Sequence, residues 1–293
     1  MILNISGRTD VVAFYVDWLM NRLEEGFVDV RNPFYPKSVS RINFCDVEAI
    51  IFCTKNPNPI LKYLDRIKIP FVFQITCTPY GSDIELGIKD KKEIVESIIE
   101  LSKRIGKEKV YLRYDPILIN KKYTMEYHEK AFERLCTLLD GYVEHVIVSF
   151  VDEYKNVNRH KGKLDMKELT DEDFLELGKR LVSIASKYQM TMQTCYEKND
   201  LTSVGFIQSA CLTKELAYSL TGRSNFGKWK ARDCGCVEMV DIGAYNTCGH
   251  YCRYCYANYD EKSVAINRKK HDVNSSLLIG YLEQDDIIKV RKK

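Results

Sequence analysis

The sequence has no long apolar run and no recognisable leader. No stretch of its 293 residues approaches the roughly 18 uninterrupted apolar residues that a transmembrane helix needs. The start, MILNISGRTD, has no basic segment followed by an apolar one, which predicts that no signal peptide is present. No linker rich in glycine, proline or serine divides the chain, and no repeat is found. We therefore expect one domain spanning residues 1–293, in a cytoplasmic protein without a membrane partner.

An excess of charge of one sign is also missing. The 44 Lys and Arg residues nearly balance the 41 Asp and Glu residues, and the formal net charge is +3. Nucleic-acid binding depends on neutralising phosphates, and no stripe of basic and aromatic residues is evident in the sequence. A nucleic acid is therefore a weaker expectation as a partner than a small-molecule substrate.

Cysteine, in contrast, is plentiful. Eleven cysteines are an odd number, in a chain too large to need disulfides for stability. Reduced thiols that bind metal in the cytosol explain them better. We interpret four that lie within or beside apolar runs as core or near-core residues: Cys45, Cys53, Cys77 and Cys136.

Three cysteines are closely spaced near the C-terminus. Cys248, Cys252 and Cys255 form a C-x3-C-x2-C triplet in CGHYCRYCYANYD. A [4Fe-4S] cluster normally takes four Cys ligands, so a triplet leaves one iron open to a small molecule. Open coordination positions are typical of catalytic centres. Two alternatives are zinc bound by the triplet with His250, and cysteines that only fill the core.

A second group consists of four cysteines that come earlier: Cys195, Cys211, Cys234 and Cys236. Four thiolates could close a second iron-sulfur cluster or a structural zinc site. A redox or substrate-facing role for Cys195 and Cys211 is a further alternative, as is the absence of any site.

Short apolar runs alternate with longer amphipathic stretches along most of the chain. The predicted strands are Ile2–Ser6, Ala49–Cys53, Val72–Thr76, Val110–Tyr114, His145–Phe150, Met190–Thr194 and Val240–Tyr245. The predicted helices are Val11–Glu25, Asn58–Arg66, Lys89–Ile105, Thr124–Leu139, Thr170–Lys187 and one beginning near Cys211. This alternation predicts an α/β fold with a parallel sheet, a full or partial TIM-like (β/α) barrel. Barrel units would occupy 1–194, the second cysteine region 195–236, a strand and cysteine loop 238–260, and a tail 261–293.

Polar residues follow most of the predicted strands. The strand exits carry Asp10, Lys55, Arg113, Asp115, Asp152, Cys195 and Glu197. In a barrel the C-terminal ends of the strands meet on one face, where the active site lies. Some of these residues also have a plainer interpretation: Asp10 as a helix cap, Asp115-Pro116 as a turn, and Lys55 as a surface lysine.

The motifs together resemble a known but uncharacterised group. The SGRTD start, the TKNP and RYDP segments and the C-terminal CGC…CxxxCxYCYAN are similar to those of a bacterial and archaeal family of unknown function. The resemblance covers residues 1–260 and implies no substrate.

A second resemblance is to radical S-adenosylmethionine (SAM) enzymes of the spore photoproduct lyase type. It requires a rotated order, in which Val240–Ala257 comes first and Ser6–Asp10, Thr54–Pro57 and Ile75–Tyr80 follow. The resemblance implies a circularly permuted radical SAM barrel, with the strand of the cysteine triplet beside Ile2–Ser6. No GGE-type turn follows any predicted strand, and Ser6–Asp10 occupies the equivalent place.

The resemblance also implies roles for individual residues. The methionine end of SAM would be held by Ser6, Gly7, Arg8 and Asp10. A [4Fe-4S] cluster would be framed by Asn246, Thr247, Tyr254 and Asn258. An unknown substrate would be faced by Lys55, Arg113, Asp115 and Asp152.

The implied activity is the generation of a 5′-deoxyadenosyl radical, with ferredoxin or flavodoxin as electron donor. The alternatives are an electron-transfer or redox-sensing iron-sulfur protein without SAM, an enzyme of nucleic-acid repair or modification, and a structural zinc protein.

Overall fold

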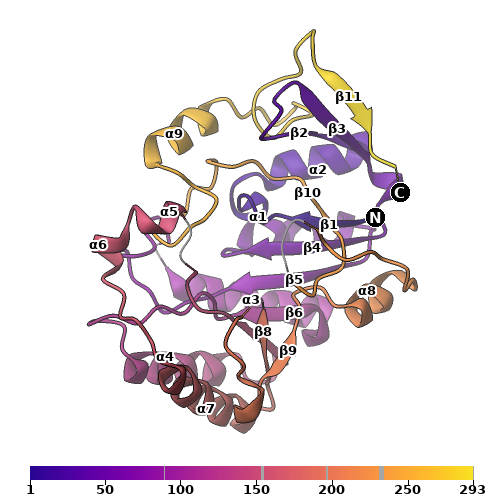
Figure 1. The fold of residues 1–293 in the computed structure, drawn as a ribbon. Coiled ribbons are helices and arrows are strands. Elements are labelled where there is room, and N and C mark those ends of the chain that lie inside the picture. Colours follow the sequence, from indigo (N-terminus) through magenta and orange to yellow (C-terminus); the bar gives the residue numbers. More distant parts are fainter. Residues whose placement is uncertain (89, 153–154, 196, 231–233, 293) are drawn as a thin grey trace.

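The computed structural model describes residues 1–88, 90–152, 155–195, 197–230 and 234–292. Its largest element is a sheet built from β1 (Ile2–Ile5), β4 (Ala49–Thr54), β5 (Phe71–Thr76), β6 (Val110–Arg113), β7 (His145–Val148), β8 (Thr191–Cys195), β9 (Ile207–Ser209) and β10 (Val240–Asp241). The strands are ordered β10-β1-β4-β5-β6-β7-β8-β9, and every neighbouring pair is parallel (Figure 1). The predicted α/β fold with a parallel sheet is confirmed.

The last strand of this sheet lies next to the first. Leu3 pairs with Val240 and Asn4 with Asp241, in parallel register. The rotated order of the sequence motifs predicts this neighbourhood. Within the described residues β10 and β9 are the two edge strands, so the sheet is compatible with a partial TIM-like barrel.

The longer helices agree with the predicted ones. The α-helices are α1 (Val11–Phe14), α2 (Val16–Glu25), α3 (Lys91–Ile105), α4 (Met125–Leu138), α5 (Lys155–Asn158), α6 (Lys161–Leu164), α7 (Asp171–Lys187), α8 (Lys214–Thr221) and α9 (Glu261–Lys269). The 3₁₀-helices are η1 (Phe44–Asp46), η2 (Asn58–Arg66), η3 (Lys107–Lys109) and η4 (Thr202–Val204). Lys89, where one helix was expected to begin, lies outside the described residues. No helix in the described ranges is long and apolar enough to cross a bilayer.

Local sequence explains where several helices begin. The side chain of Thr170 accepts a hydrogen bond from Asp173, whose own side chain accepts one from Thr170, so a reciprocal cap starts α7. Thr124 is the N-cap residue of α4, and its hydroxyl accepts a hydrogen bond from Tyr127 N. The predicted helix 11–25 is instead divided in two, because Tyr15 leaves helical geometry at φ −139°.

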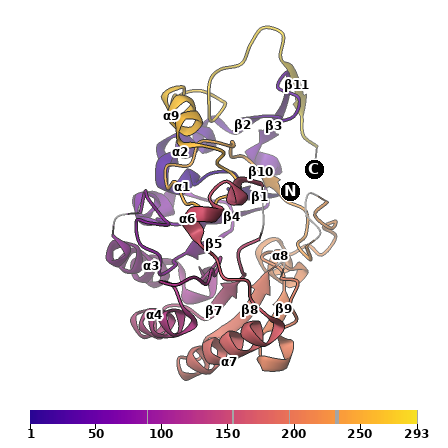
Figure 2. The same cartoon turned by 60° about the vertical axis from the view of Figure 1, so that its left-hand side comes forward.

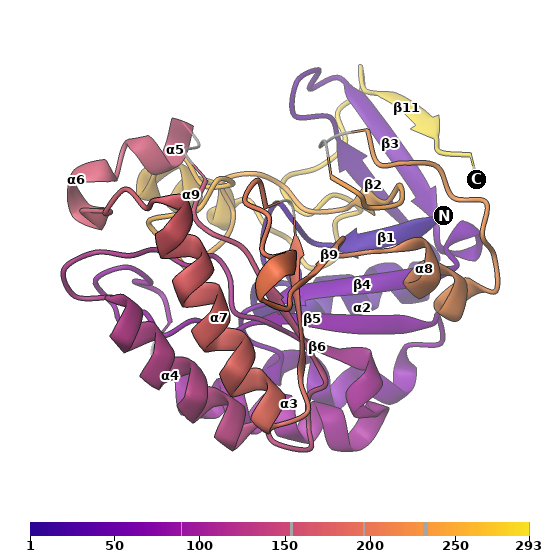
Figure 3. The same cartoon turned by 60° about the horizontal axis from the view of Figure 1, so that its bottom comes forward.

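The two faces of the sheet have different neighbours. Side chains on one face form the main core with the helices outside it, and α4 and α7 lie there side by side (Figure 3). On the opposite face a smaller cluster joins Ile2 and Ile51 of the sheet to Leu212, Ala217 and Val237. The second cysteine region, with α8, therefore covers part of the inner face.

A separate small sheet was not predicted. It consists of β2 (Phe27–Arg31), β3 (Ser38–Asn43) and β11 (Ile287–Val290), with β2 antiparallel and β11 parallel to β3. Figure 2 shows it at the opposite end of the molecule from α7. Residues 261–293, interpreted from sequence as a tail, therefore contain both α9 and β11.

Candidate functional site

The cysteine triplet lies on a loop that follows β10, here called the cysteine loop (residues 246–258). Cys248 is buried, and Cys252 and Cys255 are half-buried. The loop is closed on itself, because Asn246 N donates to Ala257 O (3.0 Å) and Asn258 Nδ2 donates to Cys248 O (2.9 Å). The positions expected to frame a cluster thus shape the loop that carries the three sulfurs.

Each of the three sulfurs has at least one neighbouring group that opposes the effect of burial on its pKa, while Asp10, Glu85 and the other thiols act in the same direction as burial at Cys248 and Cys252. Burial raises the pKa of all three thiols, that of Cys252 to about 12. A group that favours the thiolate lies near each sulfur. These groups are the backbone N–H of His250 for Cys248, the Lys55 ammonium for Cys252, and the backbone N–H of Ala257 for Cys255, at 3.3 Å.

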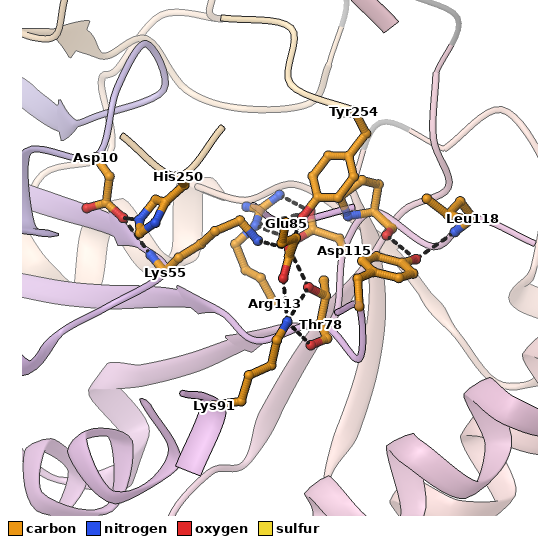
Figure 4. Close-up of polar contacts among 12 residues, drawn as sticks. Asp10, Lys55, Thr78, Glu85, Lys91, Arg113, Asp115, Leu118, His250 and Tyr254 are labelled. Atoms are coloured by element: carbon orange, nitrogen blue, oxygen red, sulfur yellow. Dashed lines mark hydrogen bonds and ion pairs between the residues drawn. The ribbon is translucent and has the colours of Figure 1, made fainter. Parts of the chain in front are cut away.

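One carboxylate joins the cysteine loop to two other turns. Asp10 accepts hydrogen bonds from Thr54 Oγ1 (2.8 Å) and Lys55 N (2.7 Å), and His250 Nε2 lies 2.8 Å from its Oδ2 (Figure 4). Its Oδ1 also caps α1 through Ala13 N at 2.9 Å. Asp10, which the resemblance predicts to hold SAM, has both carboxylate oxygens engaged by protein donors.

A second buried carboxylate, Glu85, is not predicted from the sequence. It lies on the loop after β5 and accepts from Lys55 Nζ (2.8 Å), Thr78 Oγ1 (2.6 Å), Lys91 Nζ and the hydroxyl of Tyr254. Figure 4 shows these groups converging on one carboxylate. Burial alone would raise the pKa of Glu85, but Lys55 and Lys91 outweigh burial and hold it at about 2. Its sequence cue, one acidic residue between Ile84 and Leu86, is weak.

The loop of Glu85 lies along the cysteine loop. Arg253 N donates to Ile84 O (2.9 Å) and Gly87 N to His250 O (2.8 Å), on either side of an antiparallel bridge between Glu85 and Cys252. The approach is so close that a Cβ atom on Gly87 would lie 2.2 Å from the carbonyl oxygen of residue 249. Backbone contact therefore determines where Cys252 lies.

The SGRTD turn is held between β10 and the cysteine loop. Ser6 Oγ and Gly7 N each donate to Asp241, both at 2.6 Å, and the hydroxyl of Tyr256 donates to Gly7 O at 2.5 Å. The Arg8 guanidinium lies 5.5 Å from the centre of the Tyr245 ring. The turn expected to bind SAM is thus adjacent to the triplet, as the rotated motif order predicts.

Two buried oxygens in these segments lack partners. Among the described residues neither Thr9 Oγ1 nor Asn258 Oδ1 has a hydrogen-bond partner. Buried polar atoms are normally paired, so unpaired ones beside a candidate site are compatible with a ligand that would satisfy them.

The RYDP segment forms an ion pair within itself. Arg113 Nη2 lies 2.5 Å from Asp115 Oδ2, and Arg113 Nη1 donates to Gln74 (2.9 Å) and to Cys211 Sγ (3.0 Å). Burial would lower the pKa of Arg113, but Asp115 outweighs burial and raises it.

Two other polar residues predicted at strand exits, Asp152 and Glu197, have no described contact with the cysteine triplet. Asp152 is half-buried, and no contact in the described part of the chain links it to the cysteine loop. Glu197 accepts from Phe150 N at 3.1 Å. Tyr196, between Cys195 and Glu197, lies outside the described residues.

The second cysteine group gathers in one place. Cys195 and Cys211 form a disulfide with 2.39 Å between the sulfurs, and Cys211 packs against buried Cys234 and Cys236. Of the four cysteines expected near the core, Cys77 and Cys136 are buried and Cys53 is half-buried. Cys45 is exposed, so that expectation is wrong for it.

Comparisons with known proteins place the chain in a family without assigning an activity. No curated protein matches it. A crystal structure of a candidate alpha-L-fucosidase from Bacteroides thetaiotaomicron superposes with a TM-score of 0.29 and 10% identity, over 68% of this chain and 75% of that chain. A likeness this low carries no argument. Residues 2–257 match the family described as Domain of unknown function (DUF1848), and the chain belongs to that family.

Proposed function

We propose that this protein is a radical SAM enzyme built on a circularly permuted barrel. The observation that carries the proposal is the position of the cysteine triplet, on the loop after a strand that pairs with β1. Parallel α/β folds place their active sites at the carboxyl ends of the strands. Three thiols at such a strand end, with no fourth cysteine on the same loop, are suited to a cluster with one open iron.

The donor set fits an iron-sulfur cluster better than a single ion. No three His, Cys, Asp or Glu side chains in the described ranges are arranged around a single ion. In a cluster each cysteine binds a different iron, so its three sulfurs need not converge on one point.

When bound, such a cluster would supply an open iron for the amino and carboxylate groups of SAM, and the electron that cleaves SAM to methionine and a 5′-deoxyadenosyl radical. The protein's own residues would bind and orient the cluster and SAM, and would exclude water from them. Cys248, Cys252 and Cys255 would hold the cluster. Lys55 places a positive charge near Cys252, where it would offset negative charge on the thiolates.

The SAM pocket would be formed by the SGRTD turn and the end of the cysteine loop. Arg8 would pair with the SAM carboxylate, in a position that its contact with Tyr245 defines. Thr9 and Asn258 would use their unpaired oxygens as acceptors for amino or hydroxyl groups of SAM. Asp10 would act through Lys55 and His250, which it orients, and Arg113 with Asp115 would face an unknown substrate.

Anaerobic reconstitution tests the proposal. The wild-type chain, reduced with dithionite in the presence of SAM, should release 5′-deoxyadenosine. Cys252→Ala should lose the product, while Cys45→Ser, a change at an exposed cysteine outside the triplet, should retain it. A chain that carries a full [4Fe-4S] signal and yields no 5′-deoxyadenosine would refute the proposal and favour a redox protein without SAM. Zinc without iron would favour a structural zinc protein.

A further inference from the structure

The second cysteine group brings together four sulfurs from three segments. Cys195 ends β8, Cys211 follows β9, and Cys234 and Cys236 precede β10. Cys234 and Cys236 are 7% and 2% exposed, and with Ala210 they form a buried cluster against which Cys211 packs. A reactive thiol needs one cysteine and a disulfide needs two, whereas a closed metal site takes four ligands, as many as the cysteines gathered here.

The backbone around these sulfurs is held firmly. Gln74 Nε2 donates to Cys211 O (2.5 Å) and Gln193 Nε2 to Ala210 O (3.1 Å), both from strands of the main sheet. Trp229 N donates to Cys236 O at 2.9 Å. The sheet and the loop therefore position these cysteines in advance, as a metal centre requires.

Hydrogen-bond donors also point at the sulfurs. Arg113 Nη1 lies 3.0 Å from Cys211 Sγ. The backbone N–H groups of Leu212 and Cys211 also lie beside the Cys236 sulfur. Donors to sulfur stabilise thiolates and are among the features that tune iron-sulfur clusters.

We propose that Cys195, Cys211, Cys234 and Cys236 bind a second iron-sulfur cluster as four thiolates, next to Arg113. The site is separate from the triplet, and a cluster with four protein ligands has no open iron. Structural zinc sites typically pair cysteines with two to four residues between them, whereas Cys234 and Cys236 have one. The choice of iron over zinc rests in part on the proposed function, since iron-sulfur assembly would already serve the triplet.

Loading this site requires reduction of the Cys195–Cys211 disulfide. A dithiol reductant transfers two electrons and two protons to the bond, which gives two thiols and leaves the reductant as a disulfide. Each thiol then loses its proton as it binds iron.

The test removes the first site and asks whether the second remains. The variant Cys248→Ala/Cys252→Ala/Cys255→Ala is reconstituted anaerobically with ferric iron, sulfide and dithiothreitol, with zinc also measured. We expect about four iron atoms per chain in this variant and about eight in the wild type, from one and two cubes of four irons. Failure of SAM cleavage would not change these counts, so the two proposals can fail separately.

A second pair of variants controls for folding. Cys234→Ser/Cys236→Ser in the otherwise unchanged chain should lower the iron content from about eight to about four, while Cys77→Ala/Cys136→Ala should keep about eight. The proposal would be overturned if the wild type bound only about four iron atoms per chain and Cys234→Ser/Cys236→Ser bound the same number. Zinc in place of iron would also overturn it, as would a Cys195–Cys211 disulfide that mass spectrometry still finds after reconstitution.

Discussion

The hydroxyl of Tyr254 donates a hydrogen bond to the carboxylate of Glu85, which lies 169 positions earlier in the chain. Tyr254 stands between two cysteines of the triplet, and Glu85 is fully buried beneath it. This contact ties the candidate metal loop to Lys55, Lys91 and the loop after β5. The position of the triplet therefore depends on buried charge as well as on the sheet.

Replacing Glu85 with glutamine should destabilise the protein. The change leaves Lys55 and Lys91 without the carboxylate that pairs with both, and breaking a buried ion pair costs about 3–5 kcal/mol. Urea denaturation of the metal-free protein measures the loss. Glu24→Gln, which removes an exposed partner of Arg66, is the matched control and should cost less than about 1 kcal/mol. Equal midpoints for the two variants would contradict the assignment.

The same carboxylate predicts a dependence on pH. The pKa of Glu85 is about 2 in the folded protein, against an ordinary value of 4.5. Because the folded pKa is lowered, its contribution to stability is complete above pH 4.5 and is lost as the pH falls toward 2. The difference in unfolding free energy between wild type and Glu85→Gln should thus be constant from pH 7 to 5 and shrink below that. A difference that does not change down to pH 3 would contradict the lowered pKa.

Adding a methyl group at Gly87 should disturb the cysteine loop. The new Cβ would lie 2.2 Å from a backbone oxygen of that loop, so one of the two loops must move. We expect Gly87→Ala to cost about 1–3 kcal/mol and to lower the iron bound at the triplet. Gly162→Ala, where nothing lies within 4 Å of the added atom, should bind iron as the wild type does. Full iron loading of Gly87→Ala would show that the contact does not position the triplet.

Replacing Asp10 with asparagine should separate the turns that it joins. An amide has one acceptor oxygen, and its NH2 group would face Thr54, Lys55 or His250, which now donate to the carboxylate. We expect a loss of about 1–3 kcal/mol and weaker binding of SAM, measured by titration of the cluster's EPR spectrum. Asp17→Asn, at an exposed carboxylate, is the control. Unchanged SAM affinity in Asp10→Asn would remove Asp10 from the set of positioning residues.

The sequence predicts much of this fold because its signals are local. Alternating apolar runs identify seven of the eight strands of the main sheet, and the motif order predicts that β10 lies beside β1. The strand β9 and the sheet of β2, β3 and β11 escape prediction. The strand β9 has only three residues, β11 is exposed along its whole length, and β3 pairs with β11 far away in sequence, as Ser38 does with Ile287.

The candidate site was predicted less completely. The triplet has a specific spacing, so it could be found without a structure. Glu85 and Asp241 could not be found without a structure, because a single acidic residue in a sequence gives no sign that it will be buried and paired. Asp10 could be singled out from the sequence, but only the structure shows that four protein donors reach its carboxylate.

The proposed function depends above all on whether SAM binds the iron that the triplet leaves open. SAM labelled with ¹⁷O in its carboxylate and ¹⁵N in its amino group is added to the reduced, reconstituted protein, and electron-nuclear double resonance is recorded. We predict hyperfine coupling of both labels to the cluster, and its loss in Cys252→Ala. A reduced [4Fe-4S] spectrum in the wild type with neither coupling would contradict the claim.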